Sequence, residues 1–199
     1  MPATKKEVEI KFLVEDLRAL RRKLRQTGFR EVTPRTHEIN TLYDTAKGDL
    51  RKRDELLRIR KYGKRWIFTH KSKGTSVRHK SRAETETEVA DGEKLAGIVQ
   101  ALGFRPWFCY EKFRSEWTDG NGHVVVDETP IGNVSEIEGP PRWIDATARR
   151  LGVTRQQYLT LNYVQMFLDW KKKTRSQAQE MTFRAVRRTS GQWSVVGGQ

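Results

Sequence analysis

The sequence predicts an α+β fold in which eight antiparallel strands close into a barrel with a charged interior, covered outside by α-helices. Three observations predict it. Eight segments have strand character, six of them carry charged residues at every second position, and amphipathic helices lie between them. Because side chains alternate faces along a strand, each such segment has a charged face and an apolar face.

The expected strands follow in order along the chain. Short turns at 62–64 and 119–122 join two pairs of them, and the second turn has the glycine-rich composition of a hairpin. The segments span residues 6–14, 38–44, 55–62, 65–73, 82–90, 110–118, 123–128 and 134–138.

Four helices are expected, at residues 16–26, 92–102, 141–151 and 154–170. The first places Leu17, Leu20 and Leu24 on one face. The second does the same with Leu95, Ile98, Val99 and Leu102, and Asp91 precedes it as a plausible N-cap.

The charged rows can face either water or the barrel interior. Solvent-facing rows of antiparallel strands usually mix Thr, Ser, Gln and Lys, whereas these rows are dominated by Glu and Arg. An eight-stranded barrel holds side chains or one small ligand, and the residues of one parity point inward. With the charged parity inside, the apolar parity faces outward and is covered by the helices. Buried charges must then be paired, or bind metals or anions.

Charge and length limit the remaining choices. The 199 residues suit one domain with a tail, and the net charge of +14 predicts polyanionic partners. We expect a domain at residues 1–170 and a basic C-terminal extension at 171–199, helical or partly disordered, with a late strand near Trp193 as one possibility. The extension has seven Lys/Arg and one Glu, so contact with polyphosphate or nucleic acid is expected there.

The single cysteine, Cys109, leaves no intramolecular disulfide and no cysteine-based zinc site, which fits a reducing cytoplasm. The N-terminal residues lack the apolar core of a secretory signal, and no apolar run is long enough to span a bilayer. We therefore expect a cytoplasmic protein without membrane contact.

These residues resemble the CYTH domain, the triphosphate tunnel metalloenzymes. The family's Glu-x-Glu-x-Lys signature is matched by Glu7, Glu9 and Lys11, and the resemblance spans about residues 5–170. It continues through Tyr43-Asp44-Thr45, Arg58, Arg60, Lys71, Arg82 to Glu88, Lys112, Arg114, Asp127-Glu128, Glu136 and Glu138. The resemblance implies an eight-stranded tunnel that hydrolyses triphosphates or cyclises ATP. Homodimers are common in the family.

Carboxylates of these rows are candidate ligands for Mg²⁺ or Mn²⁺, which prefer such oxygens. We expect Glu7 and Glu9, about 7 Å apart on one strand face, to serve the metal together with Asp127, Glu136 and Glu138. Glu7, Glu9 and Lys11 are the expected catalytic residues. Glu86 and Glu88 are weaker candidates, because each could instead pair with an inner Arg.

Cations of the same rows are expected to bind the substrate phosphates. They are Lys11, Arg58, Arg60, Lys71, Arg82, Lys112 and Arg114. The planar guanidinium of Arg can bind two oxygens at once, whereas Lys acts as a point charge. Tyr163 is interpreted as a packing residue, and no histidine is assigned a role.

Three function classes remain open. The first is a metal-dependent triphosphatase that hydrolyses tripolyphosphate, thiamine triphosphate or a nucleotide. The second is a class IV adenylate cyclase, which needs the same phosphate contacts but directs the ribose 3′-hydroxyl at the α-phosphorus. The third is a non-catalytic module for polyphosphate or nucleic acid. Carboxylates in the tunnel argue against this last class, because a pure anion binder does not need them.

Overall fold

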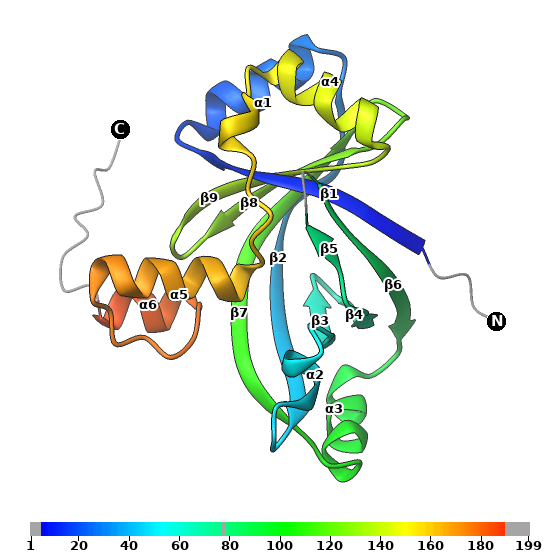
Figure 1. Cartoon of the computed structure of the whole chain (residues 1–199), viewed down its shortest axis with the longest axis vertical. Helices are drawn as coiled ribbons and strands as arrows, with labels where there is room; N and C mark the ends of the chain where they lie inside the picture. Colours follow the sequence, from blue (N-terminus) through cyan, green and yellow to red (C-terminus); the bar gives the residue numbers. More distant parts are fainter. Residues whose placement is uncertain (1–4, 77–78, 190–199) are drawn as a thin grey trace.

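The strands pair into one antiparallel sheet that closes on itself in the computed structural model, which describes residues 5–76 and 79–189 (Figure 1). The strand order is β1-β9-β8-β7-β2-β3-β4-β6, and β1 also pairs with β6, which closes the barrel. A two-residue strand, β5, adds to β6. The predicted eight-stranded barrel is therefore confirmed. The strands are β1 (Lys5–Val14), β2 (Arg30–Thr45), β3 (Leu56–Tyr62), β4 (Arg65–Lys71), β5 (Thr75–Ser76), β6 (Lys80–Val89), β7 (Phe104–Thr118), β8 (His123–Thr129) and β9 (Gly132–Glu138).

Two strands, β2 and β7, are much longer than the alternation predicted. Their added residues include Pro34 and Pro106, which cannot donate to a sheet ladder. The pairing between β2 and β7 shifts register between Thr33 and Thr36 and again where Tyr43 meets Pro106. Both prolines therefore lie at irregularities of the ladder, which is how the long strands tolerate them.

The charged parity faces inward and the apolar parity outward, as the sequence predicted. On β1, Glu7, Glu9 and Lys11 line the interior cavity, whereas Ile10 and Phe12 lie in an apolar cluster outside the barrel. Three outward-facing residues of β8 and β9 belong to the same cluster, namely Val124, Val126 and Ile137.

Two helices cover this outer cluster on one side of the barrel (Figure 1). Helix α1 (Leu17–Gln26) begins after Asp16, whose carboxylate accepts a hydrogen bond from the Ala19 amide at 2.9 Å. Helix α4 (Pro141–Leu151) contributes Ile144 and Ala148 to the cluster. The short helix α2 (Asp49–Lys52) lies between β2 and β3.

Helix α3 (Gly92–Ala101) covers β3 and β4 from outside and begins after Asp91, as predicted. Val99 is buried there and Leu95 is partly buried. In contrast, Ile98 and Leu102 remain largely exposed, because the packed face of the helix is narrower than its apolar face.

The prediction of a single helix over residues 154–170 is wrong for the first half of that range. A single 3₁₀ turn at Arg155–Gln157 is followed by extended chain, and Leu159 exchanges backbone hydrogen bonds with Lys11 of β1 at 2.8 and 2.9 Å. The strand-like pairing of Leu159 is incompatible with a helix there. Helix α5 (Tyr163–Thr174) starts only after Asn162, which forms a capping box with Gln165.

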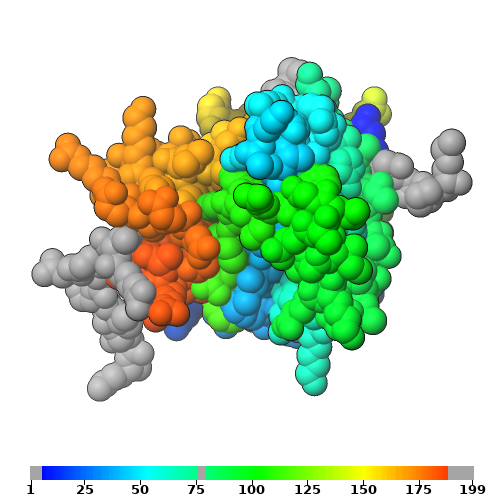
Figure 2. All heavy atoms as spheres, turned by 90° about the horizontal axis from the view of Figure 1, so that it is seen from below, coloured from blue at the N-terminus to red at the C-terminus, as the bar shows by residue number. Residues whose placement is uncertain are grey.

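Residues beyond 170 pack against the barrel as far as they are described. Helix α5 runs past that position to Thr174, and Met181 then pairs with the open edge of β7, exchanging hydrogen bonds with Cys109 and Glu111. Helix α6 (Phe183–Thr189) follows, and Figure 2 shows α5 and α6 side by side against β7. Ala178, Met181 and Val186 are buried. The strand considered near Trp193 lies outside the described residues. No helix in the described ranges is both long and apolar enough to cross a membrane.

Candidate active site

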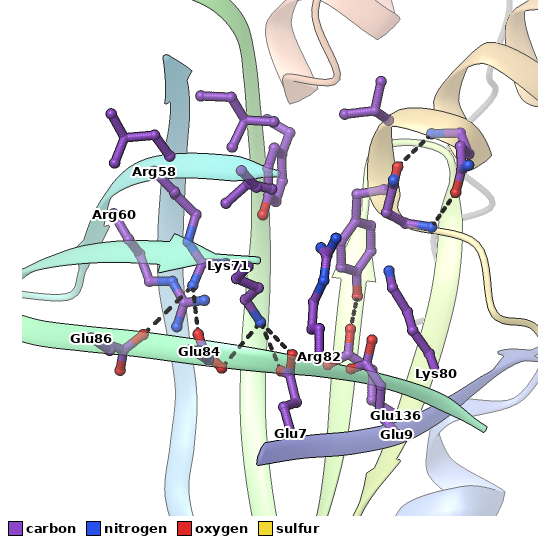
Figure 3. A pocket seen from close by; sticks show the side chains of 18 of the residues that line it. Glu7, Glu9, Arg58, Arg60, Lys71, Lys80, Arg82, Glu84, Glu86 and Glu136 are labelled. Carbon is purple, nitrogen blue, oxygen red and sulfur yellow. Dashed lines mark hydrogen bonds and ion pairs between the residues drawn. The ribbon is translucent and has the colours of Figure 1, made fainter. Parts of the chain in front are cut away.

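A cavity of about 670 Å³ occupies the barrel interior, and charged side chains from all of its walls line it (Figure 3). Most predicted site residues are brought together there. They are Glu7, Glu9, Lys11, Arg58, Arg60, Lys71, Arg82, Glu86, Lys112, Arg114, Glu136 and Glu138. Asp127 and Glu88 are the two predicted residues outside this lining.

Strands β1 and β9 form the most acidic wall. Their register places Glu9 opposite Glu138 and Lys11 opposite Glu136. The Lys11 ammonium lies 2.5 Å from a Glu9 oxygen and 3.4 Å from Glu136. Burial alone would lower the pKa of Lys11, but the Glu136 and Glu9 carboxylates outweigh it and raise that pKa, so this lysine stays charged.

The neighbouring wall, formed by β6, β4 and β3, adjoins β1 through β6 and carries most of the cations. Lys71 contacts both oxygens of Glu7 at 2.7 Å and lies 3.2 Å from Glu84 (Figure 3). Arg58 lies 3.7 Å from Glu84 and 3.6 Å from Glu86. These cations are therefore held by carboxylates that an incoming anion can displace.

We call Glu7, Glu9, Lys71, Lys80, Arg82 and Glu84 the cavity cluster, because all six side chains line the cavity. Arg82 extends across the loop that precedes β3, where it donates to the Asp54 carbonyl at 2.9 Å. The cluster thus joins β1, β4 and β6 around a common space.

A second group, the buried cluster, consists of Glu38, Lys112, Arg114 and Asp127. Asp127 accepts hydrogen bonds from Lys112 at 2.8 Å and from two nitrogens of Arg114 at 2.8 and 2.6 Å. Glu38 lies 3.5 Å from Lys112 and 3.8 Å from Arg114, and neither carboxylate is exposed at all. Burial would raise the pKa of Glu38, but Arg60, Lys112 and Arg114 outweigh it and lower that pKa.

The structure places Asp127 and Glu88 outside the lining of the cavity in which the metal was expected. Asp127 is in the interior of β8 rather than at a strand end, and its two oxygens already accept bonds from Lys112, Arg114 and Tyr163. It is a buried counter-ion and does not reach the cavity. Glu88 has the expected parity but lies towards the end of the barrel, where its side chain is 60% exposed and 3.8 Å from Arg65.

Tyr163 does more than the packing role assigned to it. Its hydroxyl donates to Asp127 and lies 2.9 Å from Glu136, so it links the buried cluster to the acidic wall. Burial and the two carboxylates raise the pKa of Tyr163 well above its usual value, which keeps the hydroxyl protonated. The sequence signal for this role is weak, because the residue is on a helix outside the strand pattern.

The structure adds cavity residues that sequence reasoning did not select. Lys80 and Glu84 have the same parity as Arg82 on β6. Glu84 lies within the row from Arg82 to Glu88, and extending that row by one position towards the N-terminus would have found Lys80. Burial, followed by the charges of Lys11, Arg82 and Lys71, lowers the pKa of Lys80 to about 8. Glu116 and His123 also line the cavity.

One mouth of the cavity is apolar and aromatic. Leu56, Leu57, Trp107 and Val164 line it, and the Arg51 guanidinium lies 4.2 Å from the Trp107 ring centroid. Arg51 is fixed by a 2.8 Å hydrogen bond to Asp44. This mouth can accept an organic group attached to a phosphate chain.

Within the described residues, no three Asp, Glu, His or Cys side chains already converge as a metal site. The carboxylates of the acidic wall are instead bound to Lys11, Lys71 and Arg114. Their chemistry nevertheless fits a hard divalent cation, because four Glu (Glu7, Glu9, Glu136 and Glu138) line one side of the cavity. The ammonium groups of Lys11 and Lys71 lie beside Glu9 and Glu7, at positions where a divalent cation could bind the same carboxylates instead.

Comparison with known proteins identifies the family. The model of the CYTH domain matches residues 5–140, which hold β1 to β9 and therefore the whole barrel. The chain belongs to the CYTH family. Members of the family are triphosphatases or adenylate cyclases that use divalent metals.

Relatives of this CYTH domain are found both by sequence and by structure. A protein of Methanocaldococcus jannaschii named as a candidate adenylate cyclase is 31% identical over 133 residues, which cover 66% of this chain and 75% of the relative. The structure of a candidate adenylate cyclase from Vibrio parahaemolyticus superposes with a TM-score of 0.74 at 17% identity, over 83% of this chain and 99% of that one. A candidate adenylyl cyclase from Hippeastrum, described as revealing a dominant triphosphatase activity, has a TM-score of 0.60 at 20% identity and covers 82% and 95%.

Proposed function

We propose that this CYTH domain is a divalent-metal-dependent triphosphatase. The observation that supports it most directly is the division of the cavity into an acidic wall on β1 and β9 and a cationic wall on β3, β4 and β6. A triphosphate–metal complex carries both signs of charge, and the two walls are complementary to it.

The cationic wall would bind and orient the phosphate chain. The phosphate chain would lie in the cavity beside five cations, which are Arg58, Arg60, Lys71, Lys80 and Arg82. Phosphoryl transfer depends mainly on such positioning and on neutralising charge in the transition state. Water attacks the terminal phosphorus, the bond to the bridging oxygen breaks, and orthophosphate leaves while these cations stabilise the remaining diphosphate.

The acidic wall would hold Mg²⁺ or Mn²⁺. Glu7, Glu9, Glu136 and Glu138 are the residues that would bind it, and a bound divalent cation supplies charge neutralisation and a more acidic water. Lys11 contacts the carboxylates of Glu9 and Glu136. Burial would raise the pKa of Glu136, but the charges of Lys11 and Arg114 outweigh it and lower that pKa. The Hippeastrum protein, which has the same fold and is described as a triphosphatase, supports the proposal.

Adenylate cyclase is the second candidate, and the apolar mouth favours it. The nearby Leu56, Leu57 and Trp107 could hold an organic group such as a nucleobase. The M. jannaschii relative is named for that activity. Hydrolysis remains the first choice because it requires only the phosphate contacts and a water. A module that only binds polyphosphate is least favoured, because half of the cavity charges would repel its ligand.

A product assay separates these candidates. Purified protein is incubated with tripolyphosphate, ATP or thiamine triphosphate in the presence of Mg²⁺ or Mn²⁺, and the products are separated by ion-exchange chromatography. Orthophosphate that disappears with EDTA is the expected result. Cyclic AMP with pyrophosphate would replace the triphosphatase by the cyclase. Absence of turnover of all three, with tight tripolyphosphate binding, would overturn both.

A further inference from the structure

A second basic surface lies outside the barrel, on the outer faces of β2 and β7 and on α6. An open hollow there is lined by Arg35, His37, Glu111, Phe113, Phe183, Arg184 and Arg187. None of these residues lines the central cavity. The surface is therefore separate from the candidate active site.

Aromatic rings form the floor of this hollow. The ring centroids of Phe113 and Phe183 are 5.5 Å apart, and those of His37 and Phe113 are 4.8 Å apart. The Arg35 guanidinium covers Phe113 at 3.5 Å from its centroid, so it presents a planar cation backed by a ring. Nucleobases stack on such aromatic rings and guanidinium planes.

Charge at the rim is positive. Arg184 and Arg187 are exposed, and neither forms a salt bridge with any residue in the described ranges. The carboxylate of Glu111 is occupied by His37 at 2.9 Å and by the Phe183 amide at 2.6 Å. The two arginines are consequently available to phosphates.

Helix α1 extends this basic surface. Its ten residues include five Lys/Arg and no Asp or Glu, and Arg18, Arg22 and Lys23 are exposed. Glu128 connects the helix to the hollow, because it binds Arg21 at 2.9 Å and Arg35 at 3.0 Å. We call the basic residues of α1, Arg35 and the arginines of α6 the basic strip; Glu128 lies between its first two parts, and the aromatic rings of the hollow lie between Arg35 and α6.

We propose that this strip binds single-stranded nucleic acid. Phosphates would lie on the arginines of α1 and α6, and one or two bases would stack in the hollow. Interleaved cations and aromatic faces are the features of proteins that bind single strands without sequence preference. A purely inorganic polyanion makes no use of the rings. A lipid surface is disfavoured because Phe113 and Phe183 are partly buried in the hollow and do not project from it.

The test is fluorescence anisotropy with a 3′-labelled 20-nucleotide oligouridine that has a 5′-hydroxyl, in EDTA. Without a triphosphate or a metal, the probe does not report on the proposed hydrolysis, so each proposal can fail independently. We expect affinity to fall steeply with salt, because each contacted phosphate adds roughly 0.7 to the slope of log K against log salt concentration.

Variants locate the binding. The double variant Arg184→Ala/Arg187→Ala is expected to reduce the slope of log K against log salt concentration by about 1.4. Phe183→Leu is expected to weaken binding roughly fivefold or more, because a stacking surface is lost. The charge-matched control is Lys47→Ala/Arg105→Ala, at the opposite end of β2 and β7, which should bind like the parent protein. Thermal unfolding checks that each variant folds.

Three results would overturn the proposal. The first is the same loss of affinity in the control as in the α6 variant. The second is equal affinity for a duplex RNA of the same length. The third is an unchanged affinity of Phe183→Leu together with displacement by polyphosphate of matched length, which would show an anion-binding surface without base stacking.

Discussion

The two charged clusters of the barrel have similar residue types but different surroundings. In the buried cluster, Glu38 and Asp127 are fully enclosed and their oxygens are committed to Lys112, Arg114 and neighbours. In the cavity cluster, carboxylates and cations border an open space of about 670 Å³. A charged interior therefore serves two purposes in one barrel. The enclosed carboxylates of Glu38 and Asp127 fix the wall, whereas the carboxylates beside the cavity can exchange partners.

The largest expected effect is on stability, from breaking the buried cluster. Asp127→Asn removes the carboxylate that lies nearest to both Lys112 and Arg114, which leaves the longer contacts to Glu38 as partial compensation for these cations. We expect a loss of about 3–5 kcal/mol in the free energy of unfolding, the range found when one partner of a buried pair is removed. Urea denaturation measures it. The control is Glu86→Gln, since the Glu86 side chain lines the cavity and is 40% exposed, and its loss of unfolding free energy should be far smaller. Equal losses in the two variants would contradict the distinction between the clusters.

The next effect concerns the cavity cluster and is seen in catalysis. Glu7→Gln removes a carboxylate of the acidic wall while keeping the volume of the side chain. We expect triphosphatase activity to fall roughly 100-fold or more, with a smaller stability loss than in Asp127→Asn. Initial rates of orthophosphate release measure it. Glu88→Gln is the matched control, because Glu88 has the same strand parity as the cavity residues but does not line the cavity. This variant should release orthophosphate at the rate of the parent protein. Retained turnover in Glu7→Gln would remove Glu7 from the proposed mechanism.

The smallest effect is a pH dependence within the buried cluster. Arg58, Arg60, Lys112 and Arg114 face Glu38 and lower its pKa in the folded protein. A lowered folded-state pKa adds stability that is complete above the unfolded value near 4.3 and is lost as the pH falls through the folded value. Glu38→Gln should therefore cost about 1.5–3 kcal/mol at pH 7.

The difference between the parent protein and Glu38→Gln should shrink below a pH of about 4. Denaturant unfolding at several pH values tests this. A difference that stays constant down to pH 3 would show that Glu38 contributes through packing alone.

Much of the barrel could be predicted because alternation is a property of single strands. Glu7, Glu9 and Lys11 show their inward parity without any knowledge of their neighbours. The ends of β2 and β7 could not be predicted in this way, since Pro34 and Pro106 argue against strands unless the partner strand accommodates a bulge.

Strand alternation also explains why only part of the candidate site could be predicted. Parity shows which way a side chain points but does not show how deep in the barrel it lies. Asp127 and Glu88 share the inward parity, yet one is sealed in the wall and the other is near the end of the barrel. Tyr163 comes from a helix, so no strand pattern could indicate its contact with Glu136.

The backbone pairing of Met181 with Cys109 and Glu111 has a practical consequence. It satisfies main-chain groups on a stretch of β7 that lies beyond its pairing with β8. A chain cut at residue 170 would leave this edge open, and an open edge is a template for association with other chains. Expression of the isolated barrel should therefore retain residues through 189, even though the family match ends at residue 140.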